Sequence, residues 1–409
     1  MTASPSAEAG TTRIASVQQA LAVAAELSKS FAVGAPSRDA RRELPHTQVE
    51  ELKRSGLLAL PVPVAYGGID APATVLAEVF RLLAQGDPSL AQIPHSHFTF
   101  SEALRLEGTH EQKAFFYAQI LDGALVANAQ SERGPHLIDV DTTALVPSAG
   151  DFVLSGRKFY STGALFADWI VVRASLSDGN GAAPTSRTPK AVAFVPRDAA
   201  GLTVVDDWDG MGQRTTASGT VTLDQVRVPA VHVVPYTPIF ARPTIYGARA
   251  QLLHAALDVG IATGALAEGV RQAGTARPHF EAGVPVATED PTLIQVAGEV
   301  TVTVRGAQAL LGEAARAVDV ARADTTEETT AAASVAVAVA KVAAVRASLE
   351  AASVLFELGG TRSATDAANL ARYWRDARTH TLHDATRWKL QHIGRHTLSG
   401  THPPRHGQL

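Results

Sequence analysis

The residues best suited to chemistry stand near the end of the sequence, in the stretch WRDARTHTLHD from Trp374 to Asp384. It holds two imidazoles, His380 and His383, and a carboxylate directly after the second one. A neutral imidazole beside a carboxylate can donate a hydrogen bond or exchange a proton near neutral pH. We predict that this stretch forms a wall of a reaction site. A helix end whose cations and histidines merely complement its negative dipole would have a similar sequence.

A second pair of histidines, His95 and His97, stands in GDPSLAQIPHSHFTF, from Gly86 to Phe100. Asp87 is a suitable helix cap and Pro88 fits the first helical position. Side chains two residues apart point in different directions on a helix and to one face on a strand. A two-histidine metal site would lack a third ligand at suitable spacing, so we favour polar site residues over metal ligands.

Length and composition limit the class of protein. A chain of 409 residues predicts two or three domains. With 46% hydrophobic residues, 19% charged residues and a net charge of −4, it has no basic character that would favour nucleic acid or an anionic membrane. The absence of cysteine excludes disulfides, thiolate metal sites and a cysteine nucleophile. The first twenty residues lack the apolar segment of a secretion signal, so we predict a cytoplasmic protein.

The hydrophobic pattern divides the chain into three domains. Residues 1–123 have the pattern of helices joined by short breaks, and residues 239–409 are helical and rich in alanine. Residues 124–238 alternate apolar and polar side chains between glycine turns, which predicts a barrel-like β-domain. The alanine and valine run from Ala331 to Leu358 is interrupted by charged residues such as Lys341. Because such charges are costly in lipid, the run predicts a buried helix of a bundle.

Several motifs, in this order and spacing, resemble the acyl-CoA dehydrogenase superfamily over nearly the whole chain. They are LKRSGLLALPVPVAYGG at 52–68, GDPS at 86–89, GRKFYSTG at 156–163, GMGQRTTASGTVTLDQVRVP at 210–229, LGG at 358–360 and WRDAR at 374–378. The resemblance implies an α+β fold with an N-terminal helical domain, a central β-domain and a C-terminal four-helix bundle. It also implies a homotetramer.

The segment after WRDAR distinguishes branches of this superfamily. Its dehydrogenases abstract a proton with a glutamate, which in many members follows that motif, whereas this chain has THTLHD. The segments NAQSERG at 128–134, FYSTG at 159–163, WDGMGQRTTASGT at 208–220 and TLHD, followed by RWK and PPRHG, look like a flavin monooxygenase branch. That branch includes dibenzothiophene monooxygenase and the SfnB-like sulfur acquisition oxidoreductases.

This second resemblance implies a chemistry and its partners. Reduced FMN, supplied by a separate NAD(P)H:flavin reductase, would react with O2 to a C4a-hydroperoxide and pass an oxygen atom to sulfur, in one or two rounds that give a sulfoxide or a sulfone. The substrate would be an organosulfur compound such as dibenzothiophene, and FAD is an alternative cofactor. The chain has no GxGxxG motif opening a βαβ unit and no Walker A motif, which also predicts that electrons come from another protein.

The resemblance assigns expected roles to individual residues. A proton would come from His383, His95 or His97, while hydrogen bonds and shielding would come from Asn128, Ser161 and the His383–Asp384 pair. His380 is expected to be structural. Cofactor contacts are expected from Asn128, Ser131, Tyr160, Ser161, Thr162, Arg277 and His383. Substrate contacts are expected from Phe98, Trp208 and Ser218.

Other interpretations remain open at the level of sequence. Each aromatic residue could belong to a hydrophobic core, and Arg277 could be an ordinary surface arginine. The protein could be an acyl-CoA dehydrogenase that holds FAD, or an N-hydroxylase or nitroso synthase of the same fold. It could also be a flavin-binding homologue without catalytic activity. We expect no metal site.

Overall fold

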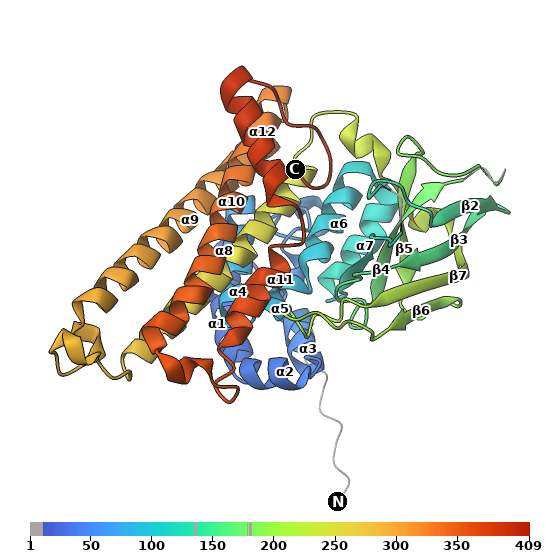
Figure 1. Cartoon of the computed structure of the whole chain (residues 1–409). Coiled ribbons are helices and arrows are strands. Elements are labelled where there is room, and N and C mark those ends of the chain that lie inside the picture. The colour runs from blue at the N-terminus through green and yellow to red at the C-terminus, as the bar shows by residue number, and fades with distance from the viewer. Residues whose placement is uncertain (1–10, 135–136, 178, 180–181) are drawn as a thin grey trace, which may run out of the picture.

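The computed structural model describes residues 11–134, 137–177, 179 and 182–409. Along the chain, an N-terminal helical domain is followed by a central β-sheet domain and a C-terminal helical domain. Figure 1 shows that the two helical parts, blue and yellow to red, pack together, while the green sheet stands to one side of them. The predicted fold class is confirmed at this level.

The N-terminal domain consists of short and medium helices. Asp87 caps one of them as predicted, since its side chain accepts hydrogen bonds from the backbone N–H groups of Ser89 and Leu90. The next helix begins at His95, so His95 and His97 lie on different sides of a helix. The α-helices are α1 (Val17–Ala32), α2 (Ala35–Arg41), α3 (His46–Arg54), α4 (Ala73–Gly86), α5 (Pro88–Gln92), α6 (His95–Glu107) and α7 (His110–Leu121).

The central domain is an eight-stranded sheet with the strand order β6-β7-β3-β2-β4-β5-β8, and β1 pairs in parallel with β4. Small and branched apolar side chains on one face of these strands are buried in a core of their own, as the alternating sequence predicts. The other face of β4 and β5 is buried as well, against α6 and α7. The connection between β4 and β5, residues 177–189, lies partly outside the described residues. The strands are β1 (Val126–Ala129), β2 (Ala144–Ser148), β3 (Asp151–Lys158), β4 (Trp169–Leu176), β5 (Lys190–Pro196), β6 (Leu202–Val205), β7 (Thr220–Val228) and β8 (Val233–Pro235).

The C-terminal domain is built around α8, which packs against α4, α9 and α10. Both α8 and α10 are long and apolar enough to cross a membrane by length and composition, yet α8 is almost wholly buried inside the protein. The alanine-rich run forms α10, and its Lys341 is fully buried. The helices are α8 (Tyr246–Ala273), α9 (Pro291–Ala323), α10 (Glu327–Gly359), α11 (Ala371–His380) and α12 (Thr386–Ser399).

The stretch WRDARTHTLHD is not one continuous helix. Helix α11 ends at His380, and the backbone N–H of His383 donates to the carbonyl of His380 in the turn that follows. His383 and Asp384 therefore lie in the connection between α11 and α12. Their side chains do not continue a face of helix α11.

Candidate active site

The candidate site lies where loops of the β-domain meet the helices. A methyl group added to Gly163 would come 3.2 Å from the carbonyl oxygen of Ile93, at the α5–α6 junction. A methyl group on Gly212 would come 2.0 Å from the carbonyl oxygen of Arg375 in α11, so only glycine permits this approach. The backbone N–H of Gln213 also donates to Asp376 Oδ1 at 2.5 Å. Two loops of the sheet are thus pressed against α5, α6 and α11.

Polar side chains of the predicted site meet at this junction. Ser96 Oγ, on α6, donates to Asn128 Oδ1 on β1 at 2.9 Å. On the loop after β3, Thr162 Oγ1 lies 2.7 Å from Ser218 Oγ, on the loop before β7. Ser161 is fully buried, and its hydroxyl has no hydrogen-bond partner among the described residues. A buried polar atom without a partner is costly unless a bound group satisfies it.

An aromatic pair stands at the edge of these loops. Tyr160 adopts a positive φ of 57°, an uncommon conformation for a large side chain, and is half exposed. Its ring meets that of Trp208 edge to face, with centroids 6.3 Å apart. The guanidinium of Arg133 lies 5.0 Å from the Tyr160 ring centroid. This edge offers two nearly perpendicular aromatic rings beside the polar loops.

A cluster of imidazoles lies behind the junction, between α6, α8 and the end of α11. The rings of His95 and His254 are stacked, with centroids 3.7 Å apart, and His383 lies 4.1 Å from His254. His254 Nδ1 is 3.0 Å from His380 Nε2. Although four imidazoles meet here, the described residues contain no group of three or more His, Asp or Glu side chains arranged to hold a metal ion.

A buried ion pair anchors this cluster. His380 Nδ1 is 2.5 Å from Asp258 Oδ1, and Lys341 Nζ is 2.6 Å from Asp258 Oδ2. All three side chains are fully buried. Burial alone would raise the pKa of Asp258, but the contacts with His380 and Lys341 outweigh it and lower that pKa. Asp258 is therefore an ionised acceptor.

The predicted proton donors differ in their surroundings. Burial lowers the pKa of His95 to about 3 and that of His97 to about 4, so both are neutral at physiological pH, not poised near neutrality. His95 Nε2 lies 3.0 Å from the carbonyl oxygen of Ala250, which can only accept, so the ring proton is committed there.

His97 is separated from the cluster by the geometry of α6. Its Nδ1 accepts from the backbone N–H of Val126, and its Nε2 donates to the carbonyl of Leu58 at 2.8 Å. Both ring nitrogens are thereby satisfied by backbone groups, and the side chain has no exposed surface. This arrangement ties α6 to β1 and leaves no ring nitrogen for proton donation.

His383 is the member of the cluster that contacts solvent, because its side chain is exposed while those of His95, His254 and His380 are buried. Desolvation lowers the pKa of His383 to about 4, and the charge of Asp384 partly opposes this shift, so His383 too is neutral at physiological pH. Asp384 is buried and forms an ion pair with Lys389, with Nζ 3.1 Å from Oδ2. His383 thus presents a neutral imidazole at the surface of the junction.

Two further predicted residues, Phe98 and Arg277, lie apart from this centre, and Ser131 lies at its edge. The Phe98 ring packs edge to face on Phe80 inside the hydrophobic core of the helices, so it does not face the junction. Ser131 forms a β-bridge with Phe159, one residue before Tyr160. Arg277 is exposed beyond the end of α8, and since His254 is nineteen residues before that end, the two lie roughly 28 Å apart along the helix axis. Within one chain, Arg277 cannot share a ligand with the cluster.

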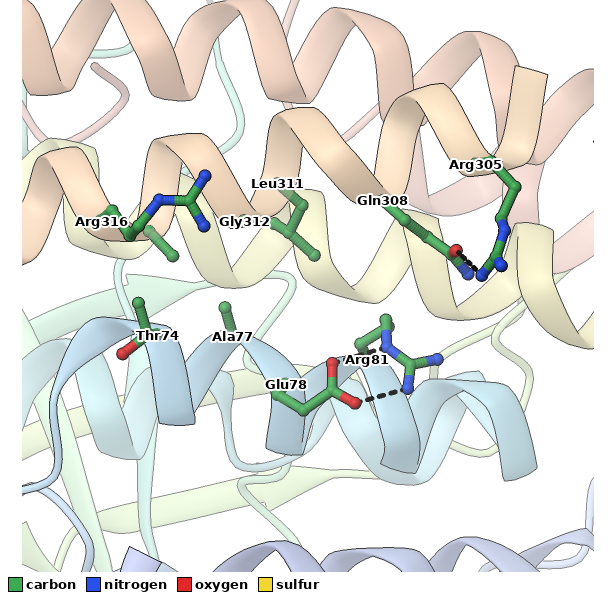
Figure 2. Close-up of a pocket in the computed structure, with 10 residues that line it drawn as sticks. Thr74, Ala77, Glu78, Arg81, Arg305, Gln308, Leu311, Gly312 and Arg316 are labelled. Atoms are coloured by element: carbon green, nitrogen blue, oxygen red, sulfur yellow. Dashed lines mark hydrogen bonds and ion pairs between the residues drawn. The ribbon is translucent and has the colours of Figure 1, made fainter. Parts of the chain in front are cut away.

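A groove of about 560 Å³ between α4 and α9 does not belong to this site. Figure 2 shows its lining, in which Arg81 pairs with Glu78 and Arg305 with Gln308. None of the predicted site residues lines it.

The site residues suit an isoalloxazine ring in their chemistry. The unpaired hydroxyl of Ser161, the amide of Asn128 and the imidazole of His383 are neutral hydrogen-bonding groups, which match the neutral edge of a flavin. Buried side-chain oxygens of Gln92 and Gln251, one helical turn before His95 and His254, also lack partners among the described residues. The junction therefore has polar atoms that a bound heterocycle would satisfy.

His254 and Asp258 are not among the site residues predicted from the sequence, and His380 was expected to be structural. The signal was present in LLHAALDVG, where an imidazole and a carboxylate four residues apart interrupt an otherwise apolar helix. Polar side chains on a buried helix need partners, so such a pair indicates a buried network. Lys341, in an alanine run, carried the same signal.

Comparison with known proteins agrees with this geometry. Three adjoining segments match family models: the acyl-CoA dehydrogenase N-terminal domain at residues 17–124, middle domain at 126–226 and C-terminal domain at 252–388. Dibenzothiophene monooxygenase of Rhodococcus qingshengii is 34% identical, over 98% of this chain and 99% of that protein. The "Probable FMNH2-dependent monooxygenase SfnC" of Pseudomonas putida is 31% identical, over 94% and 96% of the two chains.

A solved structure extends the likeness to three dimensions. TdsC from Paenibacillus sp. A11-2, crystallised with FMN and indole, superposes with a TM-score of 0.90 at 32% identity, over 96% of this chain and all of that one. Both expected resemblances are confirmed. The chain belongs to the acyl-CoA dehydrogenase superfamily and, within it, to the flavin-dependent monooxygenase branch of dibenzothiophene monooxygenase and SfnC.

Proposed function

We propose that this protein uses reduced FMN and O2 to oxygenate the sulfur atom of an organosulfur compound, with an aromatic thioether such as dibenzothiophene as the first choice. The observation that supports it most is a set of neutral polar groups around the start of α6, in a chain that matches such monooxygenases along its whole length. Asn128 accepts from Ser96, the ring of His383 lies 6.4 Å from that of His95, and the buried hydroxyl of Ser161 has no partner among the described residues. One oxygen atom passes to sulfur and the other leaves as water.

In this proposal the flavin supplies two electrons and two protons and activates O2, and the chain's own residues position the ring and exclude water. Ser161, Asn128 and His383 bind its polar edge, with Thr162 and Ser131 beside them. Tyr160 flanks the ring. FMN is preferred to FAD because TdsC binds FMN and the P. putida relative is described as FMNH2-dependent.

The substrate would rest against the aromatic edge. Trp208 and Tyr160 provide an apolar surface, and Trp208 is fixed because its Nε1 donates to the carbonyl of Gln213 at 2.9 Å. Ser218 lies between Thr162 and Thr216, 2.7 Å from the hydroxyl of each. A planar thioether offers dispersion contacts to such a surface and needs few hydrogen bonds.

The partners follow from the same proposal. A separate NAD(P)H:flavin reductase in the cytoplasm would supply reduced FMN. Exposed apolar side chains on α9, among them Val302 and Val320, suit contact with further copies in a homotetramer. In such an assembly Arg277 of one copy would be available to a flavin phosphate bound by another, which a guanidinium can hold with two hydrogen bonds.

The test is product formation under ¹⁸O2. Purified protein, photoreduced FMN and dibenzothiophene are mixed, and mass spectrometry is used to look for one labelled oxygen atom per sulfoxide. Bleaching of bound FAD by an acyl-CoA under anaerobic conditions would instead indicate a dehydrogenase, and oxidation of an amine an N-hydroxylase. Peroxide release with no labelled product from any of a series of thioethers would contradict the proposal.

His383→Ala tests the central residue. Because Ser161 and Asn128 remain, we expect FMN affinity, measured by quenching of flavin fluorescence, to change less than about threefold. Product formation should fall by roughly a hundredfold or more, the usual contribution of a positioned acid–base group. Unchanged turnover would remove His383 from the mechanism.

A further inference from the structure

A continuous line of buried polar groups runs through the helical part of the site. It starts at Lys341 on α10, passes through Asp258 on α8 and His380 at the end of α11, and returns to α8 at His254. The successive distances between heavy atoms are 2.6, 2.5 and 3.0 Å. All four side chains are buried, so solvent does not compete for these contacts.

The chemistry of the end groups dictates where the protons are. An ionised carboxylate only accepts, and Asp258 faces Lys341 with one oxygen and His380 with the other. His380 Nδ1 must therefore carry a hydrogen. That leaves one hydrogen between His380 Nε2 and His254 Nδ1, and it can belong to either nitrogen. The position of this shared proton decides whether the far nitrogen of His254, Nε2, accepts or donates.

We propose that Asp258, His380 and His254 form a proton relay that stores one proton behind His383, with Lys341 keeping Asp258 ionised. This inference rests on the proposed function, since it names what regulates the proton supply of that site. In the loaded state His380 carries hydrogens on both ring nitrogens, stabilised by Asp258, and His254 Nε2 is a donor. In the empty state both imidazoles are neutral and His254 Nε2 is an acceptor.

Proton release is balanced within the cluster. The N–H bond at His254 Nε2 breaks and a new N–H bond forms on His383. The two rings lie with their centroids 4.1 Å apart and their planes at 41°, with no direct hydrogen bond between them among the described residues, so a water molecule that joins their nitrogens would carry the proton across. At the same time His254 Nδ1 takes the proton from His380 Nε2, so one positive charge passes from the relay to His383. Reloading reverses these steps. Because the water formed with the sulfoxide takes both its protons from the reduced flavin, the relay holds a proton in transit and consumes none.

The relay explains a feature that packing alone does not. Burying charged and polar groups costs more than burying apolar side chains of similar volume. His97 shows that a buried imidazole here can be satisfied by backbone groups alone. The relay residues instead join three helices to the one imidazole of the cluster that is exposed, His383. They act through that residue and are positioning residues.

The titration of the relay depends on every charged or titratable group packed around it. His95 stacks on His254 from α6, and Asp384 and Lys389 lie beside His383. Within the relay, the positive charge of Lys341 disfavours protonation of the imidazoles, and the negative charge of Asp258 favours it. The groups are His95, His254, Asp258, Lys341, His380, His383, Asp384 and Lys389.

The test uses the full-length, flavin-free protein labelled with ¹⁵N in its histidine rings. Because His254 and His380 share one proton, their NMR signals should titrate together with one apparent midpoint. Asp258→Asn removes the charge that stabilises the loaded state, so this midpoint should fall by about one pH unit or more. If Asp258→Asn does not fold, Asp258→Asn/Lys341→Met removes both buried charges and is used in its place. Independent titration of the two rings, or an unmoved midpoint, would overturn the relay.

A second readout follows turnover. If the stored proton is needed, the high-pH limb of kcat should move to lower pH in Asp258→Asn, in parallel with the NMR midpoint, while FMN affinity stays within about threefold. A merely structural role would lower kcat equally at all pH values. His232→Asn, which removes an imidazole of the β-domain, is the matched control and should leave the profile unchanged.

The two readouts separate the relay from the proposed function. The NMR titration needs neither flavin nor sulfur compound. A shared midpoint that responds to Asp258→Asn, in a protein that oxygenates no thioether, would support the relay and reject the substrate class. Separate midpoints together with normal sulfoxide formation would reject the relay alone.

Discussion

Two buried ionic networks, one in each half of the molecule, begin with a fully buried lysine and end very differently. In the β-domain, Lys158 on β3 donates to three acceptors: the carbonyl of Gln130 at 3.0 Å, Glu132 at 2.7 Å and Asp141 at 2.9 Å. In the helical domain, Lys341 donates to Asp258, and the network continues into imidazoles.

The β-domain network is closed. All three ammonium protons of Lys158 have acceptors, and Arg173 binds Asp141 through two further hydrogen bonds. Glu132 also accepts from the backbone of Thr142 and Thr143. Burial alone would raise the pKa of Glu132, but Lys158 and these donors lower it to about 2. The hydrogen-bonding capacity of the ammonium group is therefore used up within the network.

The helical network is open at one end. Each imidazole has two nitrogens, so the chain from Asp258 to His254 can hold its hydrogens in more than one arrangement. A buried network in which every donor has an acceptor can only hold a loop in place. Here it holds the loop that follows Asn128. A network that ends in imidazoles can move a proton as well.

The two networks should differ most in how their contribution to stability changes as the pH falls. The pKa of a buried histidine that stays neutral lies below its unfolded value, so its contribution to stability is complete above about pH 6.5 and is lost as the pH falls. His95, His97 and His254 behave in this way, whereas Asp376, whose pKa burial raises to about 7, opposes them. Unfolding should take up about two protons, and the free energy of unfolding should fall by about 5 kcal/mol between pH 6 and pH 4.

Urea unfolding at a series of pH values, followed by circular dichroism, measures this loss. The helical signal should weaken first, because Glu132 of the β-domain network stays ionised until about pH 2. Stability that is constant from pH 6 to pH 4 would show that the buried imidazoles do not control it.

Removing the lysine of the closed network is the next largest change. Lys158→Met leaves Glu132 and part of Asp141 buried without a cation, which typically costs 3–5 kcal/mol, so we expect a loss of about that size in the free energy of unfolding. The loss should vary little from pH 6 to pH 9, since Arg173 still binds Asp141 and the backbone N–H groups of Thr142 and Thr143 still donate to Glu132. Urea unfolding of the flavin-free variant checks both statements. The surface variant Lys29→Met, which removes an exposed ion pair, serves as the control.

Lys341→Met should cost less, roughly 2 kcal/mol at pH 6, although its lysine is equally buried. His380 can take up a proton and replace the lost positive charge beside Asp258. Because that proton becomes harder to obtain as the pH rises, the loss should increase between pH 6 and pH 9. Equal and pH-independent losses in Lys158→Met and Lys341→Met would break the distinction between closed and open networks.

Local sequence determined which elements form and where some of them begin. Asp87 followed by Pro88 indicated the start of α5, because an aspartate oxygen and a proline satisfy the first turn of a helix without any other part of the chain. The spacing of apolar residues indicated the β-domain and the buried helix α10. Strand or helix spacing places the apolar side chains on one face, and that face must be buried whatever it packs against. The motifs indicated the family, and the resemblance to that family suggested Asn128, Ser161 and His383 as site residues.

Only the tertiary structure decided which of these residues act together. His95 and His97 are nearly adjacent in sequence, yet the helix that contains them directs one to His254 and the other to Leu58. His254, Lys341 and His380 are 39 or more residues apart and meet because α8, α10 and α11 pack side by side. Burial then lowers the pKa of His95 to about 3, which composition cannot reveal. Desolvation and side-chain contact depend on residues distant in the chain, so local propensity contains no information about them.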